Sequence, residues 1–214
     1  STCPHSIWLE RTRPASLNFP FMPAKKSPLP VAVITGAGSG VGRATALQFA
    51  AQGWRVALLG RRPEALAETR QQAPVAARAR ILTLPCDLGD PQAIETTART
   101  VLGQWGRVDV LVNAAGNNIP VRSLSELSRA DYTAVMDANV NGVLDLVQAV
   151  LPTMRKQGAG TIVNVGSEAG KQASAKAGAA YVVSKFGLTG PPQTINAEER
   201  PNGLRARRTR PSAS

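Results

Sequence analysis

Residues 31–42, VAVITGAGSGVG, constrain the fold more than any other part of the chain. The apolar run VAVI is typical of a strand buried in a parallel sheet, and Thr35 and Gly36 mark its end. Residues 44–51 are good helix formers, so a helix is predicted directly after the turn. The glycines of the turn remove Cβ atoms that would keep a ligand from the backbone, and a helix N-terminus favours an anion. This order of elements predicts a site for the pyrophosphate of a dinucleotide.

The spacing of the glycines departs from the common dinucleotide fingerprint G-x-G-x-x-G. If that fingerprint began at Gly36, its third glycine would fall on Val41. The pattern that fits is T-G-x-x-x-G-x-G, formed by Thr35, Gly36, Gly40 and Gly42. Taken alone, this pattern is as compatible with an ordinary tight turn as with a nucleotide site. The residues that follow must decide between the two.

Apolar stretches and helical patterns alternate along the rest of the chain. This alternation predicts one α/β domain over residues 31–200, built on a doubly wound parallel sheet in three α/β/α layers. At 214 residues the chain is long enough for one such core. Strands are predicted at residues 55–59, 80–84, 108–112 and 161–165, and helices at residues 63–72, 90–104 and 131–157.

The composition excludes several classes of protein. Cys3, Cys86 and His5 are too few for a disulfide framework or a metal-ligand cluster, so we expect a reducing, cytoplasmic setting and no metal. No apolar run approaches the roughly 20 residues that span a bilayer, so we expect a soluble protein with no membrane partner. Residues 1–30 are rich in proline and predict a disordered leader. An organelle-targeting segment, or extra sequence before a natural start at Met22, are alternatives.

The net charge of +11 is concentrated near the ends of the chain. Residues 200–214 carry five arginines and no acidic residue, and residues 1–30 are also basic. The body between them is therefore close to balanced, and a nucleic-acid-binding face on it is not expected. An Arg-rich tail that binds nucleic acid or an acidic partner is kept as one alternative function.

Further motifs follow the glycine turn in a fixed order. They are N-A-A-G at residues 113–116, D-A-N-V-N-G around Asn139, Ser167 after a predicted strand, and Y-V-V-S-K from Tyr181 to Lys185. With T-G-x-x-x-G-x-G, they make residues 31–189 resemble the short-chain dehydrogenases and reductases. The resemblance implies a Rossmann-type fold, hydride transfer between a nicotinamide cofactor and a small carbonyl or alcohol substrate, and homo-oligomers as the usual assembly.

The chemistry of that reaction assigns roles to the predicted catalytic residues. Negative charge grows on a carbonyl oxygen as hydride arrives, so a proton donor must meet it. Tyr181 and Lys185 share a helix face at i and i+4, and an ammonium near a phenol favours proton exchange by it. We expect Tyr181 to act as the general acid and base and Ser167 to hold the oxygen. The resemblance adds Asn139, which supports a water path to Lys185, and a contact of Lys185 with the nicotinamide ribose.

The residue after the second predicted strand bears on the choice of cofactor. Gly60 and Arg61 stand where an acidic residue would favour NAD, and Arg can pair with a 2′-phosphate, so NADP is preferred over NAD. Arg61 as a merely solvated residue before a helix is the alternative. Asp87 holds the adenine ring by resemblance, and a carboxylate in a turn is the equally weighted alternative. The full set of expected cofactor contacts is Thr35, Gly36, Ser39, Gly40, Val41, Gly42, Arg61, Asp87, Leu88, Asn113, Ala114, Gly116, Tyr181 and Lys185.

The sequence departs from the family pattern beyond residue 189. Pro191 and Pro192 predict a helix break, with helix resuming at residues 197–200. Arg207 and Arg208 would put charge on both faces of a buried strand, so residues 204–210 are not expected to form one. The fold is therefore expected to lack the last two strands of the family, with residues 201–214 as a disordered basic tail. A truncated or frame-shifted C-terminus would explain this departure from the family pattern. Part of the usual oligomer interface would then be missing as well.

The motifs together favour an NAD(P)-dependent oxidoreductase that interconverts a ketone and a secondary alcohol. A nucleotide-binding module of the same family, silent because of its altered C-terminus, is the alternative.

Overall fold

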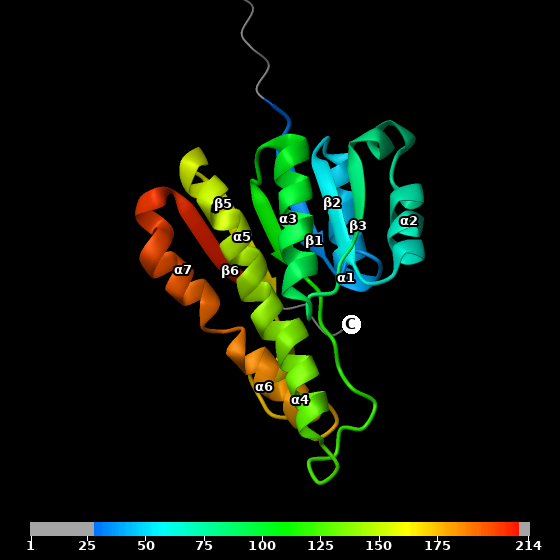
Figure 1. Cartoon of the computed structure of the whole chain (residues 1–214), viewed down its shortest axis with the longest axis vertical. Helices are drawn as coiled ribbons and strands as arrows, with labels where there is room; N and C mark the ends of the chain where they lie inside the picture. Colours follow the sequence, from blue (N-terminus) through cyan, green and yellow to red (C-terminus); the bar gives the residue numbers. More distant parts are fainter. Residues whose placement is uncertain (1–27, 210–214) are drawn as a thin grey trace, which may run out of the picture.

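A computed structural model of the chain describes residues 28–209. The predicted leader, residues 1–30, lies outside the described residues except for its last three. Within the described part, one parallel sheet of six strands has the order β3-β2-β1-β4-β5-β6 (Figure 1). The strands are β1 (Val31–Thr35), β2 (Arg55–Gly60), β3 (Ile81–Pro85), β4 (Val110–Asn113), β5 (Gly160–Val165) and β6 (Leu204–Thr209).

Helices cover both faces of the sheet, as the predicted three-layer α/β class requires. The burial of β1 shows why, because Val31 and Val33 belong to one apolar cluster and Ala32 and Ile34 to the other. The first cluster includes residues of α3, α5 and α7, and the second includes residues of α1 and α2. The helices are α1 (Gly40–Ala51), α2 (Pro63–Gln72), α3 (Pro91–Trp105), α4 (Arg129–Met136), α5 (Gly142–Gln157), α6 (Ala179–Gly187) and α7 (Pro191–Glu199).

The strand order reverses between β1 and β4, which are neighbours in the sheet. Their carboxyl ends are level, since Thr35 lies opposite Asn113. β5 continues the alignment, with Asn164 opposite Asn113. A ligand of an open parallel sheet binds outside the carboxyl ends at such a reversal.

The sixth strand corrects the prediction that residues 204–210 cannot join the sheet. β6 pairs in parallel with β5 along its whole length. Leu204 and Ala206 are buried in the same cluster as α5 and α7, whereas Arg205 and Arg207 are exposed on the opposite face. The prediction was wrong because it assumed a strand buried on both faces, and an edge strand needs only one apolar face. One of the two strands expected to be missing is therefore present.

A side chain from α7 engages the outer edge of β6. Asn196 Oδ1 accepts a hydrogen bond from the backbone N–H of Ala206 at 2.8 Å, and Asn196 Nδ2 donates to the Ala206 carbonyl at 2.8 Å. The Asn196 amide thus satisfies two backbone groups that would otherwise be unpaired at the edge of the sheet.

The helix break predicted at Pro191 and Pro192 is confirmed. α6 ends at Gly187, and both prolines stand in the first turn of α7, where a missing N–H costs nothing. The helix resumes there and not at residue 197 as predicted. Gly203, with φ 78°, then ends the short 3₁₀ turn before β6.

The helix predicted over residues 131–157 is a continuous helical run with an irregularity at its centre. α4 passes into α5 through a π turn, Asp137–Asn141. By length and apolar content alone the run Arg129–Gln157 could cross a membrane. Leu146 and Met154, however, are buried in the cluster beneath the sheet, so a core position explains its apolar character.

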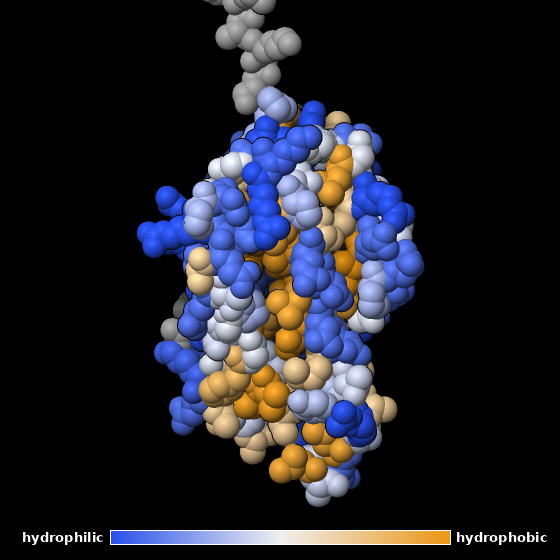
Figure 2. Space-filling model, turned by 60° about the vertical axis from the view of Figure 1, so that its left-hand side comes forward, coloured by the Kyte–Doolittle hydropathy of each residue, from blue (hydrophilic) through white to orange (hydrophobic). Residues whose placement is uncertain are grey.

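Apolar side chains also reach the surface at the lower end of the molecule (Figure 2). α4, α6 and the segment between β4 and α4 lie there (Figure 1). The exposed apolar side chains of these segments are Val121, Leu124, Val183 and Phe186.

Candidate active site

A cavity of about 660 Å³ lies at the carboxyl ends of the strands. The turn between β1 and α1, the segments after β2, β3 and β4, the π turn and α6 all contribute to its walls. It therefore brings together residues that are up to 150 positions apart in sequence. The predicted site residues that line it are Thr35, Gly36, Ser39, Gly40, Val41, Gly42, Arg61, Asp87, Leu88, Ala114, Gly116, Asn139, Tyr181 and Lys185.

Two glycines of the β1–α1 turn are required by its geometry. Gly36 has φ 65°, and a Cβ built on it would lie 2.8 Å from the Cα of Ala115. A Cβ on Gly42 would lie 2.3 Å from the carbonyl oxygen of Gly36. No side chain fits at either position, because the atoms met are backbone. The glycines let the N-terminus of α1 approach the end of β1 closely, which is the arrangement that receives a phosphate.

Thr35 joins the ends of β1 and β4. Its buried Oγ1 accepts hydrogen bonds from the N–H groups of Ala114 at 3.1 Å and Ala115 at 3.0 Å. These bonds fix the start of the N-A-A-G segment against the glycine turn. Thr35 thus shapes the cavity wall by holding these two backbone segments together.

Arg61 and Asp87 lie exposed at the cavity, after β2 and β3 respectively. Arg61 Nη2 is 3.5 Å from Asn117 Oδ1, so the guanidinium crosses from the β2 end toward the β4 end. Asp87 Oδ1 accepts from the Gly89 N–H at 3.0 Å. The carboxylate of Asp87 thus makes a turn contact beside the cavity, and its contact with the adenine ring stays a prediction.

Tyr181 and Lys185 lie one helical turn apart on α6 and both face the cavity. Lys185 Nζ is 5.4 Å from the centroid of the Tyr181 ring. A Cβ on Gly116 would lie 3.2 Å from the same Nζ, so the small residue after β4 makes room for the ammonium. Burial lowers the pKa of Lys185 below its ordinary value of 10.5.

Asn139 stands in the π turn and is fully buried. Its Oδ1 accepts from the Asn117 N–H at 2.7 Å, and its Nδ2 donates to the Asn117 carbonyl at 2.8 Å. Nδ2 also lies 3.0 Å from Ser184 Oγ, which donates to the carbonyl of Tyr181. The side chain thus connects the segment after β4 to the helix of Tyr181 and Lys185. A π turn is a common device at functional sites because it aims a side chain out of the helical register.

Two predicted site residues do not line the cavity. Ser167 follows β5, and its Oγ accepts from the Ala169 N–H at 3.2 Å, which caps a short 3₁₀ turn. Asn113 is buried behind the wall, where its Nδ2 donates to Asn164 Oδ1 at 2.9 Å. Asn113 is therefore placed to support the strand ends, not to touch a ligand directly.

Asn117 lines the cavity, and both Arg61 and Asn139 contact it. Two other residues at the site, Cys86 and Arg43, were not predicted from the sequence. Cys86 also lines the cavity, and burial raises the pKa of its thiol, which favours the protonated form. Arg43 contacts the glycine turn from behind. Only its place one residue after Gly42 could have drawn attention to it.

The fold and the cavity define a dinucleotide-binding α/β protein with a Tyr-Lys pair at the carboxyl edge of its sheet. The family model described as short chain dehydrogenase matches residues 30–213. The chain belongs to this family, whose members are oxidoreductases.

Similar proteins and solved structures support this family assignment. Sulfoacetaldehyde reductase 2 of Chromohalobacter salexigens is 38% identical over 142 residues, which cover 66% of this chain and 56% of that protein. D-threitol dehydrogenase of Mycolicibacterium smegmatis is 34% identical over 182 residues, covering 85% and 69%. A metagenomic short-chain oxidoreductase in complex with NADP superimposes with a TM-score of 0.80 at 36% identity, covering 86% of this chain and 82% of that one. The chain thus spans little more than half the length of the first of these relatives.

Proposed function

We propose that this chain is an NADP-preferring oxidoreductase that interconverts a ketone and a secondary alcohol. The observation that carries the proposal is that one cavity holds both the glycine turn and the Tyr181–Lys185 pair. The turn fits a dinucleotide, because Gly36 and Gly42 let the N-terminus of α1 pack closely against the end of β1, where a pyrophosphate binds. When bound, the nicotinamide cofactor supplies or accepts the hydride.

Tyr181 and the side chains around it supply the proton and the hydrogen bonds that the reaction needs. In reduction, the carbonyl carbon gains a hydride and its oxygen takes the proton of the Tyr181 hydroxyl, which yields the alcohol. Lys185 places an ammonium near the Tyr181 ring and favours release of that proton. Ser167 Oγ accepts from the Ala169 N–H and still carries its own O–H, which donates a hydrogen bond to the carbonyl oxygen. Asn139 positions α6 and supports the path that returns a proton to Lys185.

The preference for NADP rests on Arg61. Its exposed guanidinium lies beside the cavity after β2, where it can pair bidentately with a 2′-phosphate. A similar protein of solved structure, the metagenomic oxidoreductase, is complexed with NADP. The proposal includes a small-molecule carbonyl or alcohol partner, a cytoplasmic location and a homo-oligomer, the last checked by light scattering on the purified chain.

The test combines binding with turnover. NADPH should bind purified protein at micromolar concentration, as followed by nucleotide fluorescence, and a panel of ketones should oxidise it. Tyr181→Phe should abolish turnover and leave NADPH binding within about twofold, since only the proton donor is lost. Tyr132→Phe is the matched control, because Tyr132 is the other tyrosine of the chain. Retained turnover in Tyr181→Phe would refute the assignment, and binding without turnover in the wild type would favour the silent module.

A further inference from the structure

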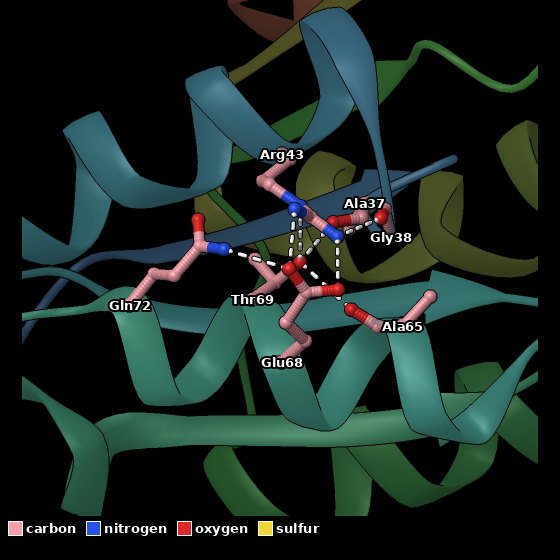
Figure 3. A network of polar contacts seen from close by, with 7 residues as sticks. All are labelled: Ala37, Gly38, Arg43, Ala65, Glu68, Thr69 and Gln72. Carbon is pink, nitrogen blue, oxygen red and sulfur yellow. Dashed lines mark hydrogen bonds and ion pairs between the residues drawn. The ribbon is translucent and has the colours of Figure 1, made fainter.

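Arg43, the fourth residue of α1, makes a set of contacts on the far side of the glycine turn (Figure 3). Its Nη2 donates to the Gly38 carbonyl at 2.6 Å, and its Nε donates to Thr69 Oγ1 at 3.1 Å. Its two terminal nitrogens also bind the Glu68 carboxylate, at 3.0 and 2.9 Å. One guanidinium therefore ties the glycine turn to α2.

The contacts of Thr69 and Gln72 extend this network. Thr69 is buried, and its Oγ1 lies 2.9 Å from the carbonyl oxygens of both Ala37 and Ala65. Gln72 donates to Glu68 Oε1 at 2.9 Å, which orients the carboxylate toward Arg43. Two successive carbonyls of the turn, those of Ala37 and Gly38, are thus held from α1 and α2 together (Figure 3).

Holding these carbonyls also fixes the amides on the opposite side of the same peptides. In a trans peptide the N–H points opposite to the C=O, and the described residues contain no cis peptide. The N–H groups of Gly38 and Ser39 therefore point away from Arg43 and Thr69, and the Ser39 N–H makes a long hydrogen bond of 3.5 Å to the Gly36 carbonyl. Both residues line the cavity. A turn rich in glycine could otherwise rotate these peptides at little cost, which would scatter its donors.

We propose that Arg43 is a positioning residue for the dinucleotide: it anchors the glycine turn to α2 and so presets the amides that receive the pyrophosphate. This inference rests on the proposed function of the cavity. Arg43 does not act as a free cation for the phosphate, because its charge is paired with Glu68. The Arg43–Glu68 ion pair is half exposed and by itself contributes little to stability. The hydrogen bond from Arg43 to the Gly38 carbonyl is therefore what positions the turn.

The test separates this role from a direct phosphate contact. For NADPH, Arg43→Ala and Arg43→Lys should both raise Kd about tenfold, because neither side chain reproduces the fork of the guanidinium. Glu68→Gln should raise it by a smaller factor of about two to five. If Arg43 bound the phosphate directly, Arg43→Lys would retain affinity and Glu68→Gln would tighten binding, and either result would overturn the proposal.

A second ligand separates positioning from a general effect on folding. 2′-AMP carries the adenosine and the 2′-phosphate but no pyrophosphate, so its Kd should stay within about twofold in every variant. Equal weakening of 2′-AMP and NADPH would refute the role in the glycine turn. Arg99→Lys and Glu95→Gln are matched controls, because these residues form an exposed i,i+4 pair on α3. If wild-type protein binds 2′-AMP but not NADPH, this inference and the proposed function both fail, whereas wild-type binding of NADPH with unchanged variants defeats this inference alone.

Discussion

The side chain of Asn139 binds both backbone hydrogen-bonding groups of Asn117, its N–H at 2.7 Å and its carbonyl at 2.8 Å. The same amide reaches Ser184 on α6 at 3.0 Å. Asn139 is completely buried, and the π turn is what aims it between these two segments. The wall of the cavity after β4 and the helix of the Tyr-Lys pair are thereby held as one unit.

Asn139→Ala should therefore cost both stability and activity. It leaves the N–H and carbonyl of Asn117 without these partners and removes the hydrogen bond that Ser184 Oγ accepts, which should lower the free energy of unfolding by about 3 kcal/mol. Urea denaturation of the variant measures this loss. Asn141→Ala is the control, since Asn141 is exposed and its side chain bonds Asp137 Oδ1 at 2.7 Å. Equal losses in the two variants would contradict the connecting role.

Arg61→Asp should reverse the choice of cofactor. Loss of the guanidinium removes charge-assisted bonds to a 2′-phosphate, and the new carboxylate repels it, so Kd for NADPH should rise about tenfold to a hundredfold. Kd for NADH should stay the same or fall, because a carboxylate can accept from a free 2′-hydroxyl. Fluorescence titration with both nucleotides measures the ratio. Arg70→Asp, an equal charge change at an exposed position of α2, should leave the ratio unchanged. Tighter NADH binding by the wild type would refute the preference.

Lys185→Met should stabilise the protein while it removes activity. Burial lowers the pKa of Lys185, so the folded state holds the charged form at a cost that is present below the folded pKa. That cost disappears as pH rises through the folded pKa toward 10.5. At pH 7 the variant should gain about 1 kcal/mol of unfolding free energy, and the gain should shrink in alkaline buffer. Thermal unfolding across pH checks both points, with exposed Lys156→Met as the control that should change little.

Glu199 should make the stability of the protein sensitive to acid. Arg155, and to a lesser degree Asn202, lower the pKa of Glu199 from 4.5 to about 2. A carboxylate with a lowered folded pKa stabilises the fold above its unfolded pKa, and this contribution is lost as pH falls from about 4.5 to about 2. Because Arg155 is half exposed, the loss should be about 1–2 kcal/mol.

The measurement is the free energy of unfolding of the wild type and of Glu199→Gln between pH 7 and pH 2. The variant should start less stable at pH 7 and lose less between pH 4.5 and pH 2. Parallel curves would show that the Arg155–Glu199 pair, which joins α5 to α7, contributes nothing to the fold.

Much of the fold and of the site could be predicted from local signals. The helix over residues 63–72 has the predicted bounds, because Pro63 can open a helix and good helix formers continue to Gln72. Strands β1 to β5 begin and end within about two residues of their predicted positions, because apolar runs and turn residues are read over short distances. Thr35, Gly36 and Gly116 were identified by motif order and do line the cavity. The roles of Tyr181, Lys185 and Ser167 stay predictions.

The sequence by itself determined the order of strands and helices, the glycine turn and the identity of the Tyr-Lys pair, because each depends on neighbouring residues or on helical spacing. Tertiary structure decided the rest. The charged segment Leu204–Thr209 became a strand because it fell at the sheet edge, where one face meets solvent and Asn196 satisfies its outer edge. The Arg43–Glu68 and Asn139–Asn117 contacts join residues 25 and 22 positions apart. Such contacts form only once packing has brought the segments together, and no local pattern encodes them.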